Sequence, residues 1–201
     1  MTTNASMTKQ SARDILISQR SQNPHFRRIR TSLLDSEPGE QGSERHFAWM
    51  TCVLALQAVK RGNFGIGSVL VDHEARILES GHNQVFAPRF TSDGHAEMVV
   101  MSRFEARQRR KLDLSRCTLY TSLESCPMCL CRLITSGVGT VLYVAADNIG
   151  GMVRCKEALP PVWRDLAKAQ KHRQAHCPRP LQQAASDIFM LNAQQLNQGL
   201  V

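Results

Sequence analysis

The sequence predicts an α/β domain built in layers, in which some of the strands pair in parallel. The main observation is an alternation along the chain: short apolar runs typical of buried strands are separated by longer segments with helical apolar spacing. The length of 201 residues fits one globular domain with an appendage. Apolar residues make up 42% of the chain, an ordinary proportion for a protein with a sizeable core.

Residues 1–43 are expected to form a polar N-terminal extension, and residues 44–201 the body of the domain with helices at its C-terminal end. The extension has few core-type residues and ends in a linker rich in turn-forming residues, 36–43 (SEPGEQGS). An apolar triplet, 15–17 (ILI), is expected to anchor a short helix on the body. Two alternatives remain for the rest of the extension: it is disordered, or it covers a neighbouring subunit.

The first half of the body is predicted to be a helix, a hairpin and a second helix. Residues 46–60 (HFAWMTCVLALQAVK) are apolar on most faces, which predicts a largely buried helix. Residues 68–71 (SVLV) are typical of a buried strand, and residues 76–79 (RILE) of its hairpin partner. A loop rich in turn formers, 81–94, then leads to a helix over 95–110.

The second half continues the alternation. Residues 116–122 (RCTLYTS) and 139–145 (GTVLYVA) are predicted strands, and residues 126–136 form a predicted helix between them. The pattern weakens after this point. Two further helices are expected over 162–170 and 181–196, packed on the sheet.

The formal net charge of +8 is a mild indication of polyanion binding, because Lys and Arg displace the counterions of a phosphate backbone. The basic residues are spread along the chain, and only Arg109–Lys111 forms a tight cluster. A solvated helix end is the stronger interpretation of that cluster.

The seven cysteines are expected to be reduced thiols and metal ligands rather than disulfides. Their number is odd, and the first residues (MTTNASMTKQSARD) lack the apolar stretch of a secretory signal. No apolar run approaches the roughly 20 residues needed to cross a bilayer. A cytoplasmic protein without a membrane partner is therefore the expectation.

Two short segments carry the residues with the most specific chemistry. Residues 94–97 (GHAE) and 123–129 (LESCPMC) each open a predicted helix. In the second segment Cys126 and Cys129 place two sulfurs about one helical turn apart, near a helix N-terminus that favours thiolates. Thiolates suit zinc, and His95 would supply a third ligand. Three protein ligands leave the fourth position to water, which is typical of catalytic zinc.

Each of these two motifs, taken alone, also has an interpretation other than catalytic zinc. A single Cys-x-x-Cys also occurs in redox pairs and structural zinc sites, and a single His-x-Glu carries almost no information. Their combination at two helix starts is much more specific, and Glu97 would point a carboxylate at the zinc-bound water. Cys131 is a candidate fourth ligand, but its offset of two from Cys129 turns it to another helix face. His172, His176 and Cys177 could form a second metal site, although no carboxylate or cysteine pair stands beside them.

With these motifs the chain resembles the cytidine and deoxycytidylate deaminase-like superfamily, whose pattern is H-x-E…P-C-x-x-C. It is most similar to the group of bacterial nucleoside and base deaminases that includes tRNA-specific adenosine deaminases and guanine deaminases. The resemblance covers about residues 47–146. It also includes residues 65–71 (GIGSVLV) and 81–83 (GHN), which are similar to a strand and a Gly-x-Asn segment of the family.

The resemblance implies a three-layer α/β/α cytidine deaminase-like domain with a mixed central sheet. It implies one zinc ion per chain, held by His95, Cys126 and Cys129, and Glu97 as the residue that moves protons. A zinc-activated water would attack the carbon that bears the exocyclic amine, and ammonia would leave. By the same analogy the protein is expected to be a homodimer.

Four residues are expected to contact the substrate: Asn83, Ala96, Phe86 and Trp163. Asn83 matches a polar residue that touches the base in relatives, although Gly-His-Asn is also an ordinary turn. Phe86 and Trp163 would stack on a planar ring, and ordinary packing is the alternative for both.

The chain also departs from the family's pattern at three positions. Ser125 stands where the family usually has proline before its first cysteine, Gly65 where proline is common, and Gly94 where alanine is common. Serine leaves the thiolates intact but does not fix the backbone as proline does. These changes are expected to affect substrate identity more than chemistry.

Three functions remain open at this point. The first is a zinc-dependent hydrolytic deaminase of a free nucleobase, nucleoside or related small N-heterocycle. The second is a tRNA-specific adenosine deaminase, which needs a basic surface for the anticodon loop. Its partner, tRNA, is less favoured because residues 187–197 (DIFMLNAQQLN) are nearly uncharged. The third is a non-catalytic zinc scaffold, against which the presence of Glu97 argues.

Overall fold

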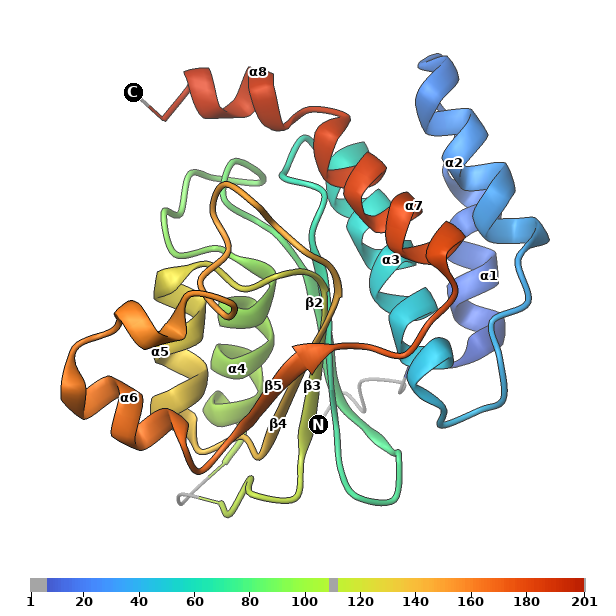
Figure 1. Cartoon of the computed structure of the whole chain (residues 1–201). Helices are drawn as coiled ribbons and strands as arrows, with labels where there is room; N and C mark the ends of the chain where they lie inside the picture. The colour runs from blue at the N-terminus through green and yellow to red at the C-terminus, as the bar shows by residue number, and fades with distance from the viewer. Residues whose placement is uncertain (1–6, 109–111, 201) are drawn as a thin grey trace.

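A five-stranded mixed sheet forms the centre of the protein (Figure 1). The computed structural model describes residues 7–108 and 112–200. The strand order is β2-β1-β3-β4-β5, and the strands are β1 (Gly67–Val71), β2 (Ile77–His82), β3 (Thr118–Leu123), β4 (Thr140–Ala145) and β5 (Lys171–Gln174). β1 pairs antiparallel with β2 and β3, whereas β3, β4 and β5 are parallel. The predicted mixed sheet is confirmed.

Helices cover both faces of the sheet, which confirms the three-layer architecture (Figure 1). One face carries α3 (Glu44–Lys60) and α7 (Arg179–Met190), and the other carries α4 (Ala96–Ala106), α5 (Pro127–Ser136) and α6 (Pro161–Ala167). Successive residues of a strand point to opposite faces, so Val69 packs on the α3 side and Leu70 on the α4 side. Both faces are buried, which explains the nearly continuous apolar strands.

The N-terminal segment forms two helices, α1 (Lys9–Ser18) and α2 (Pro24–Asp35), rather than the single short helix expected around residues 15–17. Asn23 caps α2, and Pro24 occupies its first turn. Leu16 and Leu33 lie in the same buried core as α3, whereas Ile17 is exposed. Both helices therefore add to the main core of the domain.

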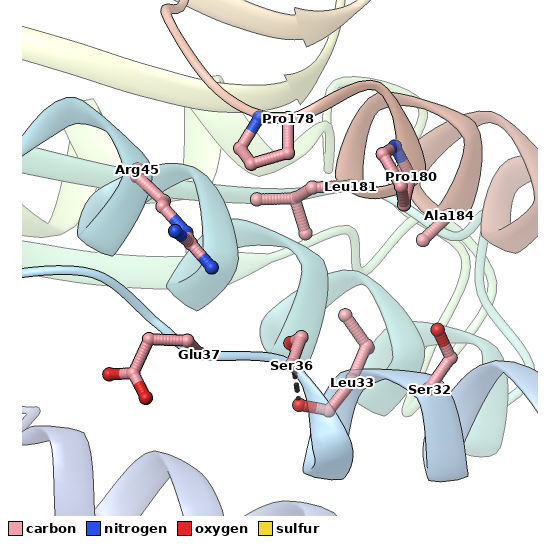
Figure 2. A pocket seen from close by; sticks show the side chains of 9 residues that line it. All are labelled: Ser32, Leu33, Ser36, Glu37, Arg45, Pro178, Pro180, Leu181 and Ala184. Atoms are coloured by element: carbon pink, nitrogen blue, oxygen red, sulfur yellow. Dashed lines mark hydrogen bonds between the residues drawn. The ribbon is translucent and has the colours of Figure 1, made fainter.

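A shallow groove separates α2 from the start of α7 (Figure 2). Leu33 and Leu181 supply apolar surface from the two helices, and Pro178 and Pro180 lie above them. The Ser36 hydroxyl donates to the Leu33 carbonyl at 2.9 Å and so closes the last turn of α2. This groove lies on the α3 side of the sheet, whereas the zinc ligands described below open the helices of the other side.

Two other expectations need correction. The segment 171–174 (KHRQ) is an edge strand, which the sequence did not indicate because it is polar and mostly exposed. The predicted helix over 181–196 is two helices, α7 and α8 (Ala193–Gln198), because the chain turns at Leu191 and Asn192. A short 3₁₀ helix, Lys156–Ala158, precedes α6.

The Arg109–Lys111 cluster lies outside the described residues. Among the helices that are described, none combines the length and apolar content required to cross a membrane.

Trp49→Ala is expected to lower the free energy of unfolding by about 3–5 kcal/mol, the usual cost of deleting a buried Trp or Phe side chain. Trp49 is fully buried in α3, and its indole N–H donates to the Leu33 carbonyl at 3.0 Å. Urea denaturation measures the change. Trp163→Ala, at a half-buried site on α6, is the matched control and should cost less. An equal loss of unfolding free energy in the two variants would contradict the inference that Trp49 contributes more to the core than Trp163 does.

Glu44 links the start of α3 to β5 and gives a pH-dependent contribution to stability. Its carboxylate accepts from Arg173 Nη1 at 3.0 Å and from the His176 backbone N–H at 2.7 Å. The Arg173 hydrogen bond is the main cause that lowers the pKa of Glu44. A carboxyl whose pKa is lowered by folding stabilises the protein above its unfolded pKa of about 4.5, and the contribution is lost as the pH falls through the lower folded value.

The stability difference between the wild type and Glu44→Gln is therefore expected to be constant above about pH 5.5 and to shrink below pH 4.5. Urea midpoints measured between pH 3 and pH 7 test this dependence. A difference that is the same at both ends of the range would contradict the linkage.

Candidate active site

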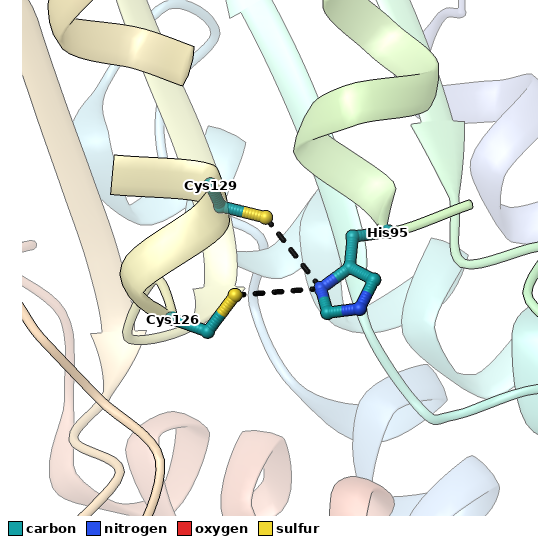
Figure 3. A group of neighbouring side chains, drawn as sticks. All are labelled: His95, Cys126 and Cys129. Atoms are coloured by element: carbon teal, nitrogen blue, oxygen red, sulfur yellow. Dashed lines mark hydrogen bonds between the residues drawn. The ribbon is translucent and has the colours of Figure 1, made fainter. Parts of the chain in front are cut away.

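The three predicted zinc ligands sit at the N-terminal ends of two neighbouring helices. His95 is the N-cap residue of α4, and Cys126 is the N-cap residue of α5, where Pro127 follows in the first turn. Both caps have extended backbone, so their side chains project from the helix ends. Cys129 lies within the first turn of α5. Because α4 and α5 pack against each other, the three side chains point toward one another (Figure 3).

Their separations fit a zinc ion. His95 Nδ1 lies 3.5 Å from Cys126 Sγ and 3.6 Å from Cys129 Sγ. A tetrahedral zinc with usual bond lengths, about 2.0–2.1 Å to nitrogen and about 2.3 Å to sulfur, places such ligand pairs roughly 3.6 Å apart. Among the described residues this is the one group of three suitable ligands within range of one another. His95, Cys126 and Cys129 therefore form the zinc site, and Cys131 takes no part in it.

The possible second metal site is not formed in the described part of the chain. His172, His176 and Cys177 do not come together as a ligand group. Instead, His172 Nε2 pairs with the side-chain oxygen of Gln170 at 3.0 Å, and burial lowers the pKa of His172 to about 4. These residues belong to the edge of the sheet and the turn that follows it.

Hydrogen bonds within the ligand group favour the thiolate form of Cys126. Hydrogen bonds from Cys129 and from His95 lower the pKa of Cys126 to about 4. The same interaction raises the pKa of Cys129, because its thiol donates to the Cys126 thiolate and it is itself buried. One thiolate thus stands at the helix N-terminus, where the backbone dipole also favours it.

Glu97 lies against these ligands in the first turn of α4. Its carboxylate is buried; Oε1 accepts from Ser125 Oγ at 2.9 Å and from Thr121 Oγ1 at 3.3 Å. Oε2 lies 3.5 Å from Cys129 Sγ. Burial, and next the charge of Cys126, raise the pKa of Glu97. A raised pKa makes the carboxyl group a better proton acceptor, which suits a residue that accepts and returns protons.

A pocket opens in front of the zinc ligands. Its cavity volume is about 170 Å³. His95, Glu97 and Cys126 line one part of it, and Asn83 lies beside them. The pocket therefore places a metal site, a buried carboxylate and an amide around one space.

Asn83 has a free hydrogen-bond donor in this pocket. Its side-chain oxygen accepts from the Val85 backbone N–H at 3.1 Å, which orients the amide. Its Nδ2 is buried and has no partner among the described residues. An unpaired buried donor costs free energy, so this group is suited to an acceptor on a bound molecule.

The other three expected substrate contacts are placed differently. Ala96 is fully buried between His95 and Glu97, and its side chain does not line the pocket. Phe86 packs against Phe64 with ring centroids 5.5 Å apart and lies behind the pocket wall. Trp163 packs on the apolar cluster between α5 and α6, away from the zinc ligands. The stacking roles of Phe86 and Trp163 stay predictions, and in the structure both rings pack against neighbouring apolar side chains.

The apolar walls of the pocket include residues that sequence reasoning did not single out. Phe64 and Ile66 come from the chain before β1, and Phe189 and Leu200 from the C-terminal segment that passes over the site. Asn192 ties this segment down by donating to the Asn63 carbonyl at 2.9 Å. The helical pattern of 181–196 indicated a helix, but nothing local showed that it would reach the site.

Glu124 organises the opposite side of the pocket. Its buried carboxylate accepts from Arg154 Nε at 2.7 Å, from the Arg154 backbone N–H at 2.9 Å and from the Asp147 backbone N–H at 3.1 Å. These contacts hold the loop after β4 against the zinc segment. Glu124, two residues before Cys126, thus holds this loop in place.

Comparison with known proteins agrees with this arrangement. The family model described as the cytidine and deoxycytidylate deaminase zinc-binding region matches residues 43–145, about half of the chain. A probable cytosine deaminase from Schizosaccharomyces pombe is 28% identical over 136 residues, which is 65% of this chain and 81% of that protein. A tRNA-specific adenosine deaminase from Bacillus subtilis is 35% identical over 97 residues, which is 48% of this chain and 58% of that protein.

Solved structures show the same fold. A structure from a study of tRNA:A34 deaminases aligns with a TM-score of 0.60 at 25% identity, covering 71% of this chain and 98% of that one. A guanine deaminase from Nitrosomonas europaea aligns with a TM-score of 0.57 at 18% identity, covering 87% and 96%. With the family match over half the chain and a His/Cys/Cys site beside Glu97, the protein belongs to the cytidine and deoxycytidylate deaminase family of zinc enzymes.

Proposed function

We propose that this enzyme removes an exocyclic amino group from a free nucleobase, nucleoside or related small N-heterocycle and releases ammonia. The observation that carries the proposal is the unpaired Nδ2 donor of Asn83 in the same apolar-walled pocket as Glu97 and the zinc ligands. A planar ring fits such a pocket: its faces meet apolar side chains and an acceptor on its edge meets the amide.

The residues have distinct roles in this reaction. When bound, zinc supplies a water-derived nucleophile near neutral pH. Glu97 would accept one proton from that water and pass it to a ring nitrogen, and would then carry the proton of the newly formed hydroxyl group to the departing amine. Asn83 would orient the ring through its donor, while Ala96 is proposed to contribute through its backbone. The carbon gains the oxygen of water, the C–N bond breaks, and ammonia leaves.

The C-terminal segment favours a small substrate. Phe189 and Leu200 line the pocket from α7 and the end of the chain, and both are uncharged. RNA binding needs cations along the phosphate path, and residues 187–197 contain none. The S. pombe relative, which matches over the larger part of its length, is described as a probable cytosine deaminase.

A tRNA-specific adenosine deaminase is the second candidate, and one feature favours it. Arg61 and Arg103 lie in hollows next to His82, which directly precedes Asn83. Within the described residues neither arginine forms an ion pair. They would be available to phosphate groups of a nucleic acid whose base enters the pocket.

Ammonia release separates the two candidates. Zinc-loaded protein is incubated with purine and pyrimidine bases, their nucleosides, aminotriazines, aminopteridines and an anticodon stem-loop RNA. Release from a small heterocycle and not from RNA is the expected result. Release from RNA alone would overturn the proposal in favour of tRNA.

A homodimer and a cytoplasmic location stay predictions. The first rests on the resemblance and the second on the reduced cysteines expected from the sequence. Light scattering on the purified protein tests the dimer, for which a mass of about 45 kDa, twice the chain mass of 22.5 kDa, is expected.

A further inference from the structure

Ser125 touches Glu97 directly, although it is neither a zinc ligand nor a residue that lines the pocket. Its hydroxyl donates to Glu97 Oε1 at 2.9 Å, and both side chains are almost fully buried, with 1% and 3% of their surface exposed. The Ser125 carbonyl accepts from the Met152 backbone N–H at 2.9 Å. The residue is therefore held in place from the far side while its hydroxyl points at the carboxylate.

The two oxygens of Glu97 have different surroundings. Oε1 receives the hydroxyls of Ser125 and Thr121, of which the Thr121 contact is longer at 3.3 Å. Oε2 receives no hydroxyl and lies 3.5 Å from Cys129 Sγ. A glutamate side chain has three rotatable bonds, so a donor on one oxygen fixes the orientation of the carboxylate and keeps the other oxygen toward the zinc ligands.

By the resemblance described above, Ser125 stands where proline is usual in the family. Proline fixes the backbone but carries no hydroxyl. The substitution thus exchanges backbone rigidity for a hydrogen bond to the carboxylate. A role confined to loop stability would be served by proline, whereas a role toward Glu97 requires the hydroxyl.

We propose that Ser125 is a positioning residue, whose hydroxyl holds Oε1 of Glu97 so that Oε2 faces the zinc ligands and the substrate. The proposal rests on the deaminase reaction proposed above, in which Glu97 moves the protons. Its consequence is specific: loss of the hydroxyl slows the proton-transfer steps and changes neither zinc binding nor substrate binding.

The test compares Ser125→Ala, Ser125→Pro and Ser125→Thr with the wild type. For the Ala and Pro variants kcat is expected to fall about 10- to 100-fold, the range for a lost hydrogen bond to a charged group. KM should stay within about threefold and zinc at one per chain. Ser125→Thr, which keeps a hydroxyl, should retain most of kcat. Ser136→Ala is the matched control, because Ser136 is the last residue of α5, the helix that follows Ser125, and its hydroxyl donates to the Leu133 carbonyl rather than to Glu97.

Crystal structures of the zinc-loaded wild type and Ser125→Ala give a readout that does not need turnover. Glu97 is expected to hold one rotamer in the wild type and to occupy others in the variant. A kcat within twofold of the wild type for Ser125→Pro would overturn the proposal, as would loss of zinc together with activity in Ser125→Ala, or an unchanged Glu97 rotamer. If the wild type deaminates no substrate, the proposed function fails, and the rotamer comparison still decides the role of Ser125.

Discussion

Glu97→Gln is expected to lower the rate of ammonia release by about 10²- to 10⁴-fold, the usual contribution of a general acid–base residue. Gln keeps the size of Glu and can still pair with Ser125 and Thr121, which contact the carboxylate at 2.9 and 3.3 Å. It cannot accept a proton from water and return it to the ring or the amine. The loss therefore falls on the proton-transfer steps, and substrate affinity should change little.

The measurement is ammonia release at saturating substrate, with zinc content determined on the same sample. Zinc should stay at one per chain, because Glu97 is not a ligand. Glu105→Gln, on the same helix α4 but exposed and paired with Arg132, is the matched control and should keep the wild-type rate. A Glu97→Gln enzyme that retains both zinc and most of its activity would show that another group moves the protons.

Cys129→Ser is expected to remove zinc from the purified protein and to bring ammonia release down to background. Cys129 is a buried member of the ligand group, and its sulfur lies 3.6 Å from His95 Nδ1. A serine hydroxyl oxygen is a harder ligand than a thiolate sulfur and is therefore less suited to zinc. Loss of a residue that only supports a metal ligand usually lowers metal affinity by roughly 10- to 100-fold. Because Cys129 is itself a ligand, the fall in zinc affinity should be larger than this.

Atomic emission on dialysed protein measures the zinc. Cys131→Ser is the control, because Cys131 follows on the same helix but stands outside the ligand group. Full zinc in Cys131→Ser and none in Cys129→Ser is the expected pattern. The reverse pattern would mean that the metal is held by a different set of cysteines.

The zinc site could be predicted from sequence because its ligands lie at helix starts that the local pattern marks. Pro127 and the break before it identify the beginning of α5, and one helical turn separates Cys126 from Cys129. Much of the sheet was predictable for a similar reason, since β1 and β4 are mostly apolar. β5 has no such run: its residues face solvent, and its pairing depends on β4 alone.

The N-terminal helices have recognisable sequence patterns, but the polar composition of residues 1–43 predicted an extension instead. In α2 the buried residues Phe26, Ile29 and Leu33 have helical spacing, and Asn23 with Pro24 is a typical helix start. The polar linker after it favoured an extension with little structure. Residues 1–43 and 44–201 remain a proposed division of the chain, and the described part of the first range packs on the second.

The pocket walls could not be predicted, since they depend on segments that are distant in sequence. Phe189 belongs to a helix whose pattern was recognised, but only the tertiary arrangement brings it to the zinc segment more than 60 positions earlier. Ser125 departs from the family's pattern, and its contact with Glu97 depends on the packing of α4 against the segment before α5, which no local pattern indicates. The contact of Trp163 with a planar ring stays a prediction, and in the structure Trp163 packs on the apolar cluster between α5 and α6.

Zinc titration of the metal-stripped enzyme tests the central claim most directly. Zinc is added back from zero to two equivalents per chain, and ammonia release is followed with the best small heterocycle from the panel. The rate is expected to rise in proportion to zinc and to stop rising at one equivalent per chain, because His95, Cys126 and Cys129 hold one ion. A rate independent of zinc, or one that still rises toward two equivalents, would contradict a single catalytic zinc at these residues.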